Sequence, residues 1–190
     1  MDISLIMILG IIVLVVGVIY IITYNSIIRT RNNVEENVSA IDTVFQNRYD
    51  LIPNLVEVVK QYASHEKNLL EGVTKLRSGA MSGQEMTKEK LENENMLSGT
   101  LKSIFALAEN YPDLKANENF INLQNEWTEI EDKMQAARRS YNASVKALRD
   151  IRQMFPSSIV AGMMTLKTYD MFEASEESRK SLDAKKLFNK

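Results

Sequence analysis

The chain contains no cysteine, and it is poor in the two residue types that most often interrupt regular structure. Of its 190 residues, 7 are glycine and 3 are proline. The lack of cysteine excludes disulfides, thiolate metal sites and a cysteine nucleophile, but it leaves the redox compartment open. Sparse glycine and proline favour long helices over a β-sandwich, which needs a turn signal about every ten residues.

An excess of charge of one sign is also absent. The formal net charge is −2, so no dominant basic surface indicates a nucleic-acid partner, and we expect none. The length is sufficient for a short anchor and one ordinary domain of roughly 150 residues.

One long apolar run stands at the N-terminus. Residues 3–22 contain no charged side chain, and the first charge after them is Arg29. Because an α-helix rises 1.5 Å per residue, ~20 apolar residues cover the ~30 Å hydrocarbon core of a bilayer. The run therefore predicts a transmembrane anchor, for which the representative positions are Ile3, Ile8, Ile12, Val16, Ile19 and Ile22.

A cleaved signal peptide is the competing interpretation of this run. It is disfavoured because Met1 and Asp2 are not basic, no small-x-small cleavage site follows, and the run is too long. Arg29 and Arg31 flank its C-terminal end, whereas no basic residue flanks the other end. The positive-inside rule then predicts a single-pass membrane protein with a short external N-terminus and a cytoplasmic domain.

A helical apolar stripe follows the anchor. Its residues recur in alternating steps of three and four, as in a coiled coil or bundle helix. They are Val34, Val38, Ile41, Phe45, Ile52, Leu55, Val59, Tyr62, Leu69, Val73 and Leu76. Pro53 interrupts this pattern and either kinks the helix or starts a new one. The glycine- and serine-rich stretch after Arg77 predicts a loop.

Two further amphipathic helices are predicted at residues 87–110 and 120–155, before a short Met-rich segment. The fold class is therefore all-α: an N-terminal transmembrane helix, an up-and-down bundle of three long helices, and a short C-terminal helical segment. The expected domains are the anchor at 1–24, the bundle at 25–155, and the closing segment with a polar tail at 156–190. The first helix, at ~80 Å, is longer than the second, at ~36 Å. We expect the Met-rich segment or another copy of the chain to cover the remaining stripe.

Two polar residues fall on the stripe, and both have two interpretations. Arg48 and Glu66 are either a snorkelling arginine and a surface glutamate, or members of interhelical ion pairs that fix register. A basic run further along also has two interpretations, a solvated helix face or a site for acidic lipid headgroups. Its members are Arg138, Arg139, Lys146, Arg149 and Arg152.

No catalytic motif is present, and we expect neither a metal nor a cofactor. His65 is the only histidine; His65-Glu66 begins like a zinc-protease motif but lacks the second histidine four residues later. Asp50, Glu57 and His65 are spaced to share a helix face as an acid/base or metal cluster, although solvation of that face explains them equally well. A non-enzymatic protein is therefore expected.

Three sequence blocks resemble the signatures of the LemA family. They include Ser39-Ala40-Ile41-Asp42 with Arg48-Tyr49-Asp50-Leu51-Ile52-Pro53-Asn54-Leu55-Val56-Glu57, then Tyr111-Pro112-Asp113-Leu114-Lys115-Ala116-Asn117, and Phe155-Pro156-Ser157 with Phe172-Glu173-Ala174. Val38 departs from the pattern, since tryptophan is common there. The resemblance implies a bacterial membrane protein with a cytoplasmic helical bundle and no established enzymatic activity.

The functional expectation is a membrane-anchored scaffold that self-assembles and organises or remodels the bilayer. Its partners would be the lipid bilayer and further copies of the chain. The alternative is an adaptor that presents a helical groove to another membrane or signalling protein. For either function, the candidate interaction or register residues are Arg48, Asp50, Pro53, Glu57, His65 and Glu66.

Overall fold

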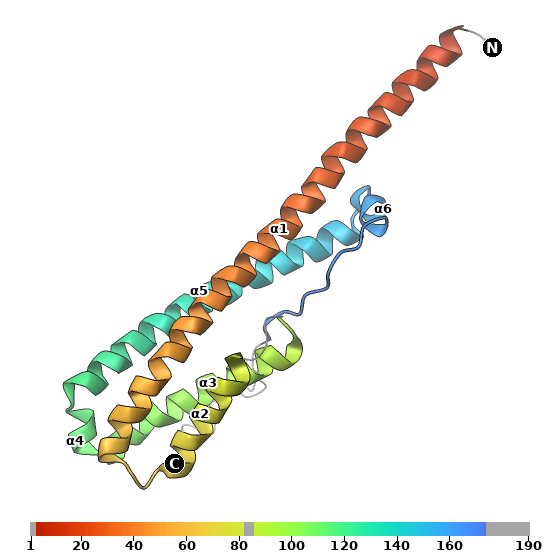
Figure 1. Ribbon diagram of the computed structural model, residues 1–190. Helices are drawn as coiled ribbons and strands as arrows, with labels where there is room; N and C mark the ends of the chain where they lie inside the picture. Colours follow the sequence, from red (N-terminus) through yellow and green to blue (C-terminus); the bar gives the residue numbers. More distant parts are fainter. Residues whose placement is uncertain (1–2, 82–85, 174–190) are drawn as a thin grey trace, which may run out of the picture. The chain divides into compact units, whose positions relative to one another are not determined.

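The computed structural model describes residues 3–81 and 86–173, and these residues form helices without any strand (Figure 1). The all-α fold class is therefore confirmed. The helices are α1 (Ile3–Tyr62), α2 (Lys67–Met81), α3 (Lys88–Leu107), the 3₁₀ turn η1 (Ala108–Asn110), α4 (Pro112–Lys115), α5 (Glu118–Gln153) and α6 (Ser157–Gly162).

The described residues divide into two compact units. One contains residues 3–47 and 129–169, and the other contains 48–81, 86–128 and 170–173. Both long helices, α1 and α5, contribute to both units. This division groups residues by contact, so the expected domain limits at residues 24 and 155 stay predictions.

Helix α1 continues without interruption from the apolar run to Tyr62, and Pro53 lies inside it. Residues 23–28, which contain neither glycine nor proline, are helical and join the apolar run to the rest of α1. The single helix expected to reach Leu76 is wrong, because the chain turns after Tyr62 and α2 begins at Lys67. No glycine or proline marks this turn; the Glu66 N–H donates to the Ala63 carbonyl (N–O 3.1 Å), and Ala63 is buried.

The loop expected directly after Arg77 is not there, because the helix continues. Ser78 to Met81 belong to α2, and residues 82–85 lie outside the described part of the chain. Ala80 is buried, so packing favours the helical conformation of this last turn. The Ser78 hydroxyl donates to the Thr74 carbonyl (3.1 Å), which is how a serine is accommodated inside a helix.

The second and third long helices, α3 and α5, agree with their predicted ranges to within a few residues. Thr87 caps α3 by accepting the Lys90 N–H (3.3 Å), and Asn117 caps α5 by accepting the Phe120 N–H (3.1 Å). Such caps satisfy backbone donors that have no partner within the helix.

The apolar stripe is largely covered within the chain itself, contrary to the expected excess. In the first unit the buried stripe residues are Val34, Ile41 and Phe45; in the second they are Ile52, Leu55, Val59 and Val73. The expectation compared the first helix only with the second, whereas α5, the third long helix, supplies a segment to each unit. In the first unit the Met-rich segment also contributes, because Met164 packs against the cluster that buries Ile27.

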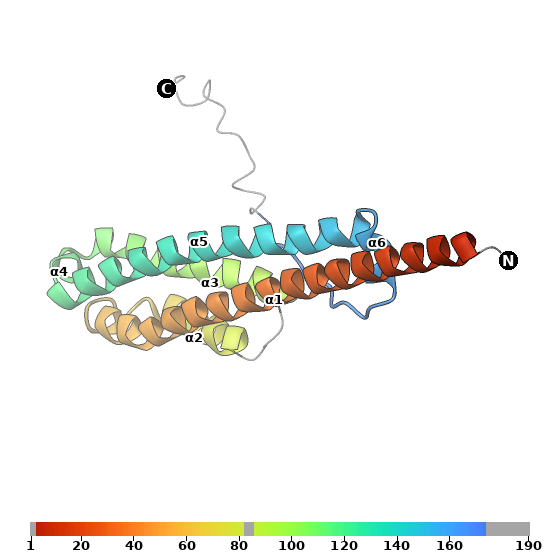
Figure 2. The same ribbon diagram turned by 90° about the horizontal axis from the view of Figure 1, so that it is seen from above.

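The apolar run at the start of α1 is uncovered. Its most apolar 18-residue window has a mean hydropathy of 3.3, and none of that window is buried against the described residues. In the ribbon of Figure 2 the first turns of α1 extend past α6. A soluble-core helix would be covered, so this segment is not part of a core. It is long and apolar enough to cross a membrane.

The continuity of α1 predicts a fixed distance between its apolar run and its polar part. Spin labels at Ile19→Cys and Glu36→Cys, 17 positions apart, should give one narrow distance near ~26 Å by pulsed EPR in detergent or bilayer. The cysteine-free chain provides a clean background. A broad distribution would mean that the helix breaks between the two parts.

Candidate functional site

A buried ion pair joins α1 to α3 in the second unit. Arg48 Nη1 lies 3.2 Å from Glu94 Oε2, and both side chains are fully buried. Arg48 was expected to be either a snorkelling surface arginine or a member of an interhelical ion pair, and the structure shows the ion pair. Charges removed from water in this way interact strongly, but each depends on the other, because one left alone would be buried without compensation.

Tyr49 links the same carboxylate to α2. Its hydroxyl donates to Glu94 Oε1 and lies 3.4 Å from the Ala80 carbonyl oxygen near the end of α2. Tyr49 is itself buried. The carboxylate of Glu94 thus receives a guanidinium and a phenol, each from α1.

An aromatic group supports the arginine from α5. The guanidinium carbon of Arg48 lies 5.4 Å from the Trp127 ring centroid, within the range of a cation–π interaction. Phe105 of α3 stands 5.8 Å from Trp127 and 5.6 Å from Phe120, centroid to centroid. Lysine in place of Arg48 would lose the planar group that pairs with a carboxylate and stacks on a ring simultaneously.

Pro53 explains a second polar contact at this site. In an α-helix the carbonyl of residue 49 accepts the N–H of residue 53, but proline has none. The Tyr49 carbonyl instead accepts the Nε–H of Arg77 from α2, with an N–O distance of 2.7 Å. The proline therefore creates an acceptor on α1 that a side chain of α2 satisfies. We name Arg48, Tyr49, Arg77, Glu94 and Trp127 the polar junction.

Glu66, the second polar residue on the apolar stripe, forms a hydrogen bond to a tyrosine rather than a buried ion pair. It is half-buried and accepts a hydrogen bond from the Tyr111 hydroxyl (3.2 Å). Partial burial, and secondly the Glu66 carboxylate, raise the pKa of Tyr111 above its ordinary value. The Tyr62 hydroxyl accepts the Asn117 side-chain amide (2.9 Å), so one contact from the end of α1 and one from the turn after it lead to residues 111–117.

The other candidate positions lie at the surface. Asp50, Pro53, Glu57 and His65 are all exposed. Within the ranges 3–81 and 86–173, no group of three or more histidine, aspartate or glutamate side chains is arranged to hold a metal ion. The alternative of a metal cluster from Asp50, Glu57 and His65 therefore receives no structural support.

Four members of the polar junction were not predicted as site residues from the sequence, although the sequence contains a recognisable signal for two of them. Glu94 falls three residues before Leu97 and seven before Leu101, on the apolar face of α3, where a carboxylate requires a partner. Pro53 identifies the Tyr49 carbonyl by simple helix counting. Nothing in the local pattern indicates Arg77 or Trp127 as partners, since their proximity depends on how the helices pack.

The six positions expected to form a membrane anchor are all exposed. Their exposed fractions are Ile3 77%, Ile8 55%, Ile12 54%, Val16 59%, Ile19 46% and Ile22 64%. After them, Arg29 is exposed, whereas half-buried Arg31 pairs with Glu35 at 3.5 Å.

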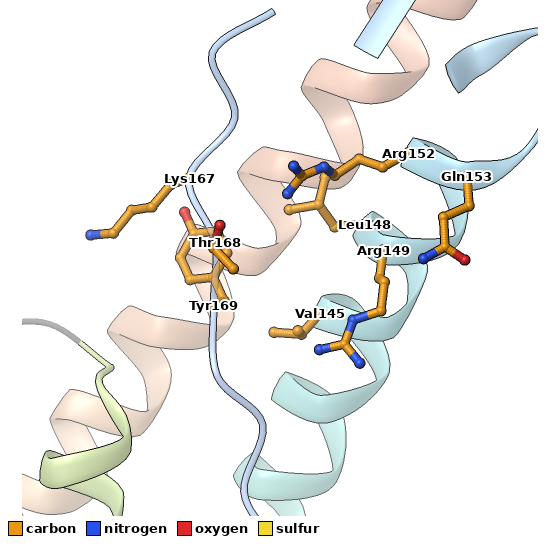
Figure 3. A pocket seen from close by; sticks show the side chains of 8 residues that line it. All are labelled: Val145, Leu148, Arg149, Arg152, Gln153, Lys167, Thr168 and Tyr169. Carbon is orange, nitrogen blue, oxygen red and sulfur yellow. The ribbon is translucent and has the colours of Figure 1, made fainter. Parts of the chain in front are cut away.

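A basic pocket of ≈ 380 Å³ lies in the first unit (Figure 3). Arg149 and Arg152 line it from α5, and Lys167 and Tyr169 line it from the segment after α6. In Figure 3 the Lys167 ammonium points away from the two arginines. Burial and the Glu35 carboxylate raise the pKa of Tyr169, and Lys167 and Arg31 oppose that rise. Two members of the basic run named from the sequence therefore share one pocket with a third cation.

Together these features define an all-α protein with an uncovered apolar N-terminal helix and a buried polar junction. The LemA family profile matches residues 37–185, and the chain belongs to the LemA family. It is also similar to "Protein LemA" of Metamycoplasma hominis, with 23% identity over 180 residues, covering 93% of this chain and 82% of that protein. The family identification made from the sequence blocks is confirmed.

Removing one member of the buried ion pair should be strongly destabilising. Arg48→Met or Glu94→Leu should each lower the free energy of unfolding by about 3–5 kcal/mol, because each leaves a lone buried charge. The double variant should lose less than the sum of the two. Urea unfolding followed by circular dichroism measures all three values.

The exposed Lys67–Glu71 pair, with an N–O distance of 3.7 Å, provides the control. Glu71→Gln should cost no more than about 1 kcal/mol. Additive losses in the Arg48/Glu94 cycle would show that the two side chains are not coupled.

The contact between Arg77 and the Tyr49 carbonyl should depend on Pro53. Arg77→Met should cost about 1–3 kcal/mol, because the carbonyl loses its donor. In a Pro53→Ala background the alanine N–H can supply the missing hydrogen bond, so the same substitution should cost clearly less. Equal costs in both backgrounds, measured by urea unfolding, would contradict this explanation.

Proposed function

We propose that this LemA-family protein is a non-enzymatic, membrane-anchored scaffold that assembles with copies of itself and organises or remodels the bilayer. The observation that carries the proposal is the uninterrupted course of α1 from an uncovered, membrane-length apolar run into both packed units. A helical connection transmits force and orientation, whereas a flexible linker would not.

The direction of the anchor follows from its flanking charges. Arg29 and Arg31 stand on the C-terminal side of the run. Positive residues next to a membrane span favour the cytoplasmic face, which supports a single-pass protein of the inner membrane with its helical units in the cytoplasm. Confinement to one membrane raises the effective concentration of copies for one another.

Two grooves of opposite charge in the second unit support assembly between copies. A groove of ≈ 470 Å³ between α1 and α2 includes Lys60, Lys67 and Lys75 with Glu71. A second, of ≈ 440 Å³, is lined by α1 and α5 and carries Glu57 and Glu126 among amide side chains. Contacts between unlike surfaces are head-to-tail, and they propagate into rings or filaments.

Charge reversal tests this assembly. Full-length protein in mild detergent should form oligomers that dissociate as salt is raised, as measured by light scattering coupled to gel filtration. Lys60→Glu with Lys75→Glu should weaken association, and Glu57→Lys with Glu126→Lys should do the same. Each pair contributes about 0.2–1 kcal/mol, so the expected change is modest, about two- to fivefold per pair. Combining both sets should restore association.

A control changes the same charge elsewhere. Lys102 and Lys146 are exposed and outside both grooves, so Lys102→Glu with Lys146→Glu should leave the mass unchanged. A strict monomer at every protein concentration would overturn the scaffold proposal.

The same ≈ 470 Å³ groove favours one alternative, an adaptor that receives an acidic helix from another membrane or signalling protein. Crosslinking in cells, with a photoreactive residue at Ser64 in that groove, separates the two functions. Crosslinks only between copies support the scaffold; crosslinks only to a different protein support the adaptor.

A further inference from the structure

The corner between α5 and α6 exposes four large apolar side chains in the first unit. The exposed fractions are 63% for Met154, 82% for Phe155, 56% for Ile159 and 74% for Met163. Single exposed apolar residues are ordinary on protein surfaces, but several within ten positions mark an interaction surface. We name residues 154–163 the apolar corner.

The opposite side of this corner packs on α1 just beyond the apolar run. Val160 and Ala161 form a buried cluster with Ile27, which is fully buried, and α6 lies beside α1 in both views (Figures 1 and 2). Ile27 follows Ile22 by five residues, or ~7.5 Å of helix. That length is close to the depth of one headgroup layer, which is ~5–7 Å. A bilayer around the apolar run would therefore have its headgroups at the level of the corner.

Three exposed cations accompany the apolar corner. They are Arg149, Arg152 and Lys167, which line the pocket shown in Figure 3. Arg152 is two residues from Met154, and Lys167 follows Leu166, which packs against the Ile27 cluster. Asp150 is also exposed on this part of α5, so the local charge is three cations against one carboxylate.

We propose that the apolar corner docks on the anionic surface of the membrane that α1 crosses. Met154, Phe155, Ile159 and Met163 enter the boundary between headgroups and acyl chains, and Arg149, Arg152 and Lys167 bind lipid phosphates. Apolar residues flanked by basic ones are the chemistry of interfacial membrane elements. This docking rests on one part of the proposed function, the insertion of α1 into the bilayer, and it does not require assembly between copies.

Docking would give the first unit two attachments to one bilayer. Because α1 holds the corner at the membrane, docking is an intramolecular event with a high effective concentration of lipid. A soluble partner would gain nothing from that position, whereas an anionic lipid surface matches both the charge and the apolar side chains.

The test uses the full-length chain with single introduced cysteines, since the natural chain has none. An environment-sensitive fluorophore at Phe155→Cys reports docking, one at Ile12→Cys reports insertion of α1, and one at exposed Glu36→Cys reports an aqueous site. The protein is reconstituted in phosphatidylcholine vesicles with and without phosphatidylglycerol. The Phe155 probe should be immersed with phosphatidylglycerol, the Ile12 probe in both lipids, and the Glu36 probe in neither.

A charge variant tests the role of the cations. Each basic residue near an anionic surface strengthens attachment about fivefold, so Arg149→Gln with Arg152→Gln and Lys167→Gln should lower the docking equilibrium on the order of 100-fold. A matched variant with the same loss of charge, Lys88→Gln with Lys102→Gln and Lys115→Gln, should leave it unchanged. Equal effects of both variants would overturn the assignment of these cations.

The probes separate failure of the docking from failure of the anchor. An immersed Ile12 probe with an aqueous Phe155 probe in phosphatidylglycerol vesicles overturns the docking and leaves the anchor intact. An aqueous Ile12 probe overturns both. Immersion of Phe155 that is equal in both lipids overturns the recognition of anionic headgroups. A probe at Met163→Cys repeats the measurement with Phe155 intact.

Discussion

The pairing of Arg48 with Glu94 is the interaction on which the second unit depends. Both charges are fully buried, so each is tolerated only because the other is 3.2 Å away. The pair joins α1 to α3, while the neighbouring residue, Tyr49, joins the same carboxylate to α1 and brings the end of α2 close. A shift of α1 by one repeat of about seven residues would keep its apolar stripe facing the partner helices, but it would separate these charged partners. The polar junction thus defines one register among several that apolar packing alone would allow.

Pro53 contributes to this register in an indirect way. It removes one N–H from α1, and Arg77 of α2 donates a hydrogen bond to the Tyr49 carbonyl, which would otherwise have accepted that N–H. The block Arg48-Tyr49-Asp50-Leu51-Ile52-Pro53 therefore combines a buried cation, a phenol and an available carbonyl within six residues. This concentration of polar contacts gives a physical reason why these residue types occur together in an otherwise apolar stripe.

The sequence allowed the fold class to be predicted because helical periodicity and the apolar run are local signals. It predicted α3 and α5 closely, since Thr87 and the Tyr111-Pro112 step are local start and stop signals. The turn after Tyr62 was missed because no breaker residue marks it. The burial of the stripe was also misjudged, since it depends on α5 packing within each unit. At the site, Arg48 could be identified as unusual, but its partners Glu94 and Trp127 come from helices far away in sequence.

The unbroken helix α1 also has an angular consequence. Each residue of an α-helix turns the chain by about 100°, so the side chains of the apolar run have a fixed angular relation to the face that Ile27 presents to α6. Adding one residue between Ile22 and Ile27 would lengthen the protein by only ~1.5 Å, yet it would swing the α5–α6 corner about 100° around the helix axis. In the membrane-anchored state proposed above, the number of residues between the apolar run and the first unit would therefore specify a direction in the plane of the membrane as well as a height above it.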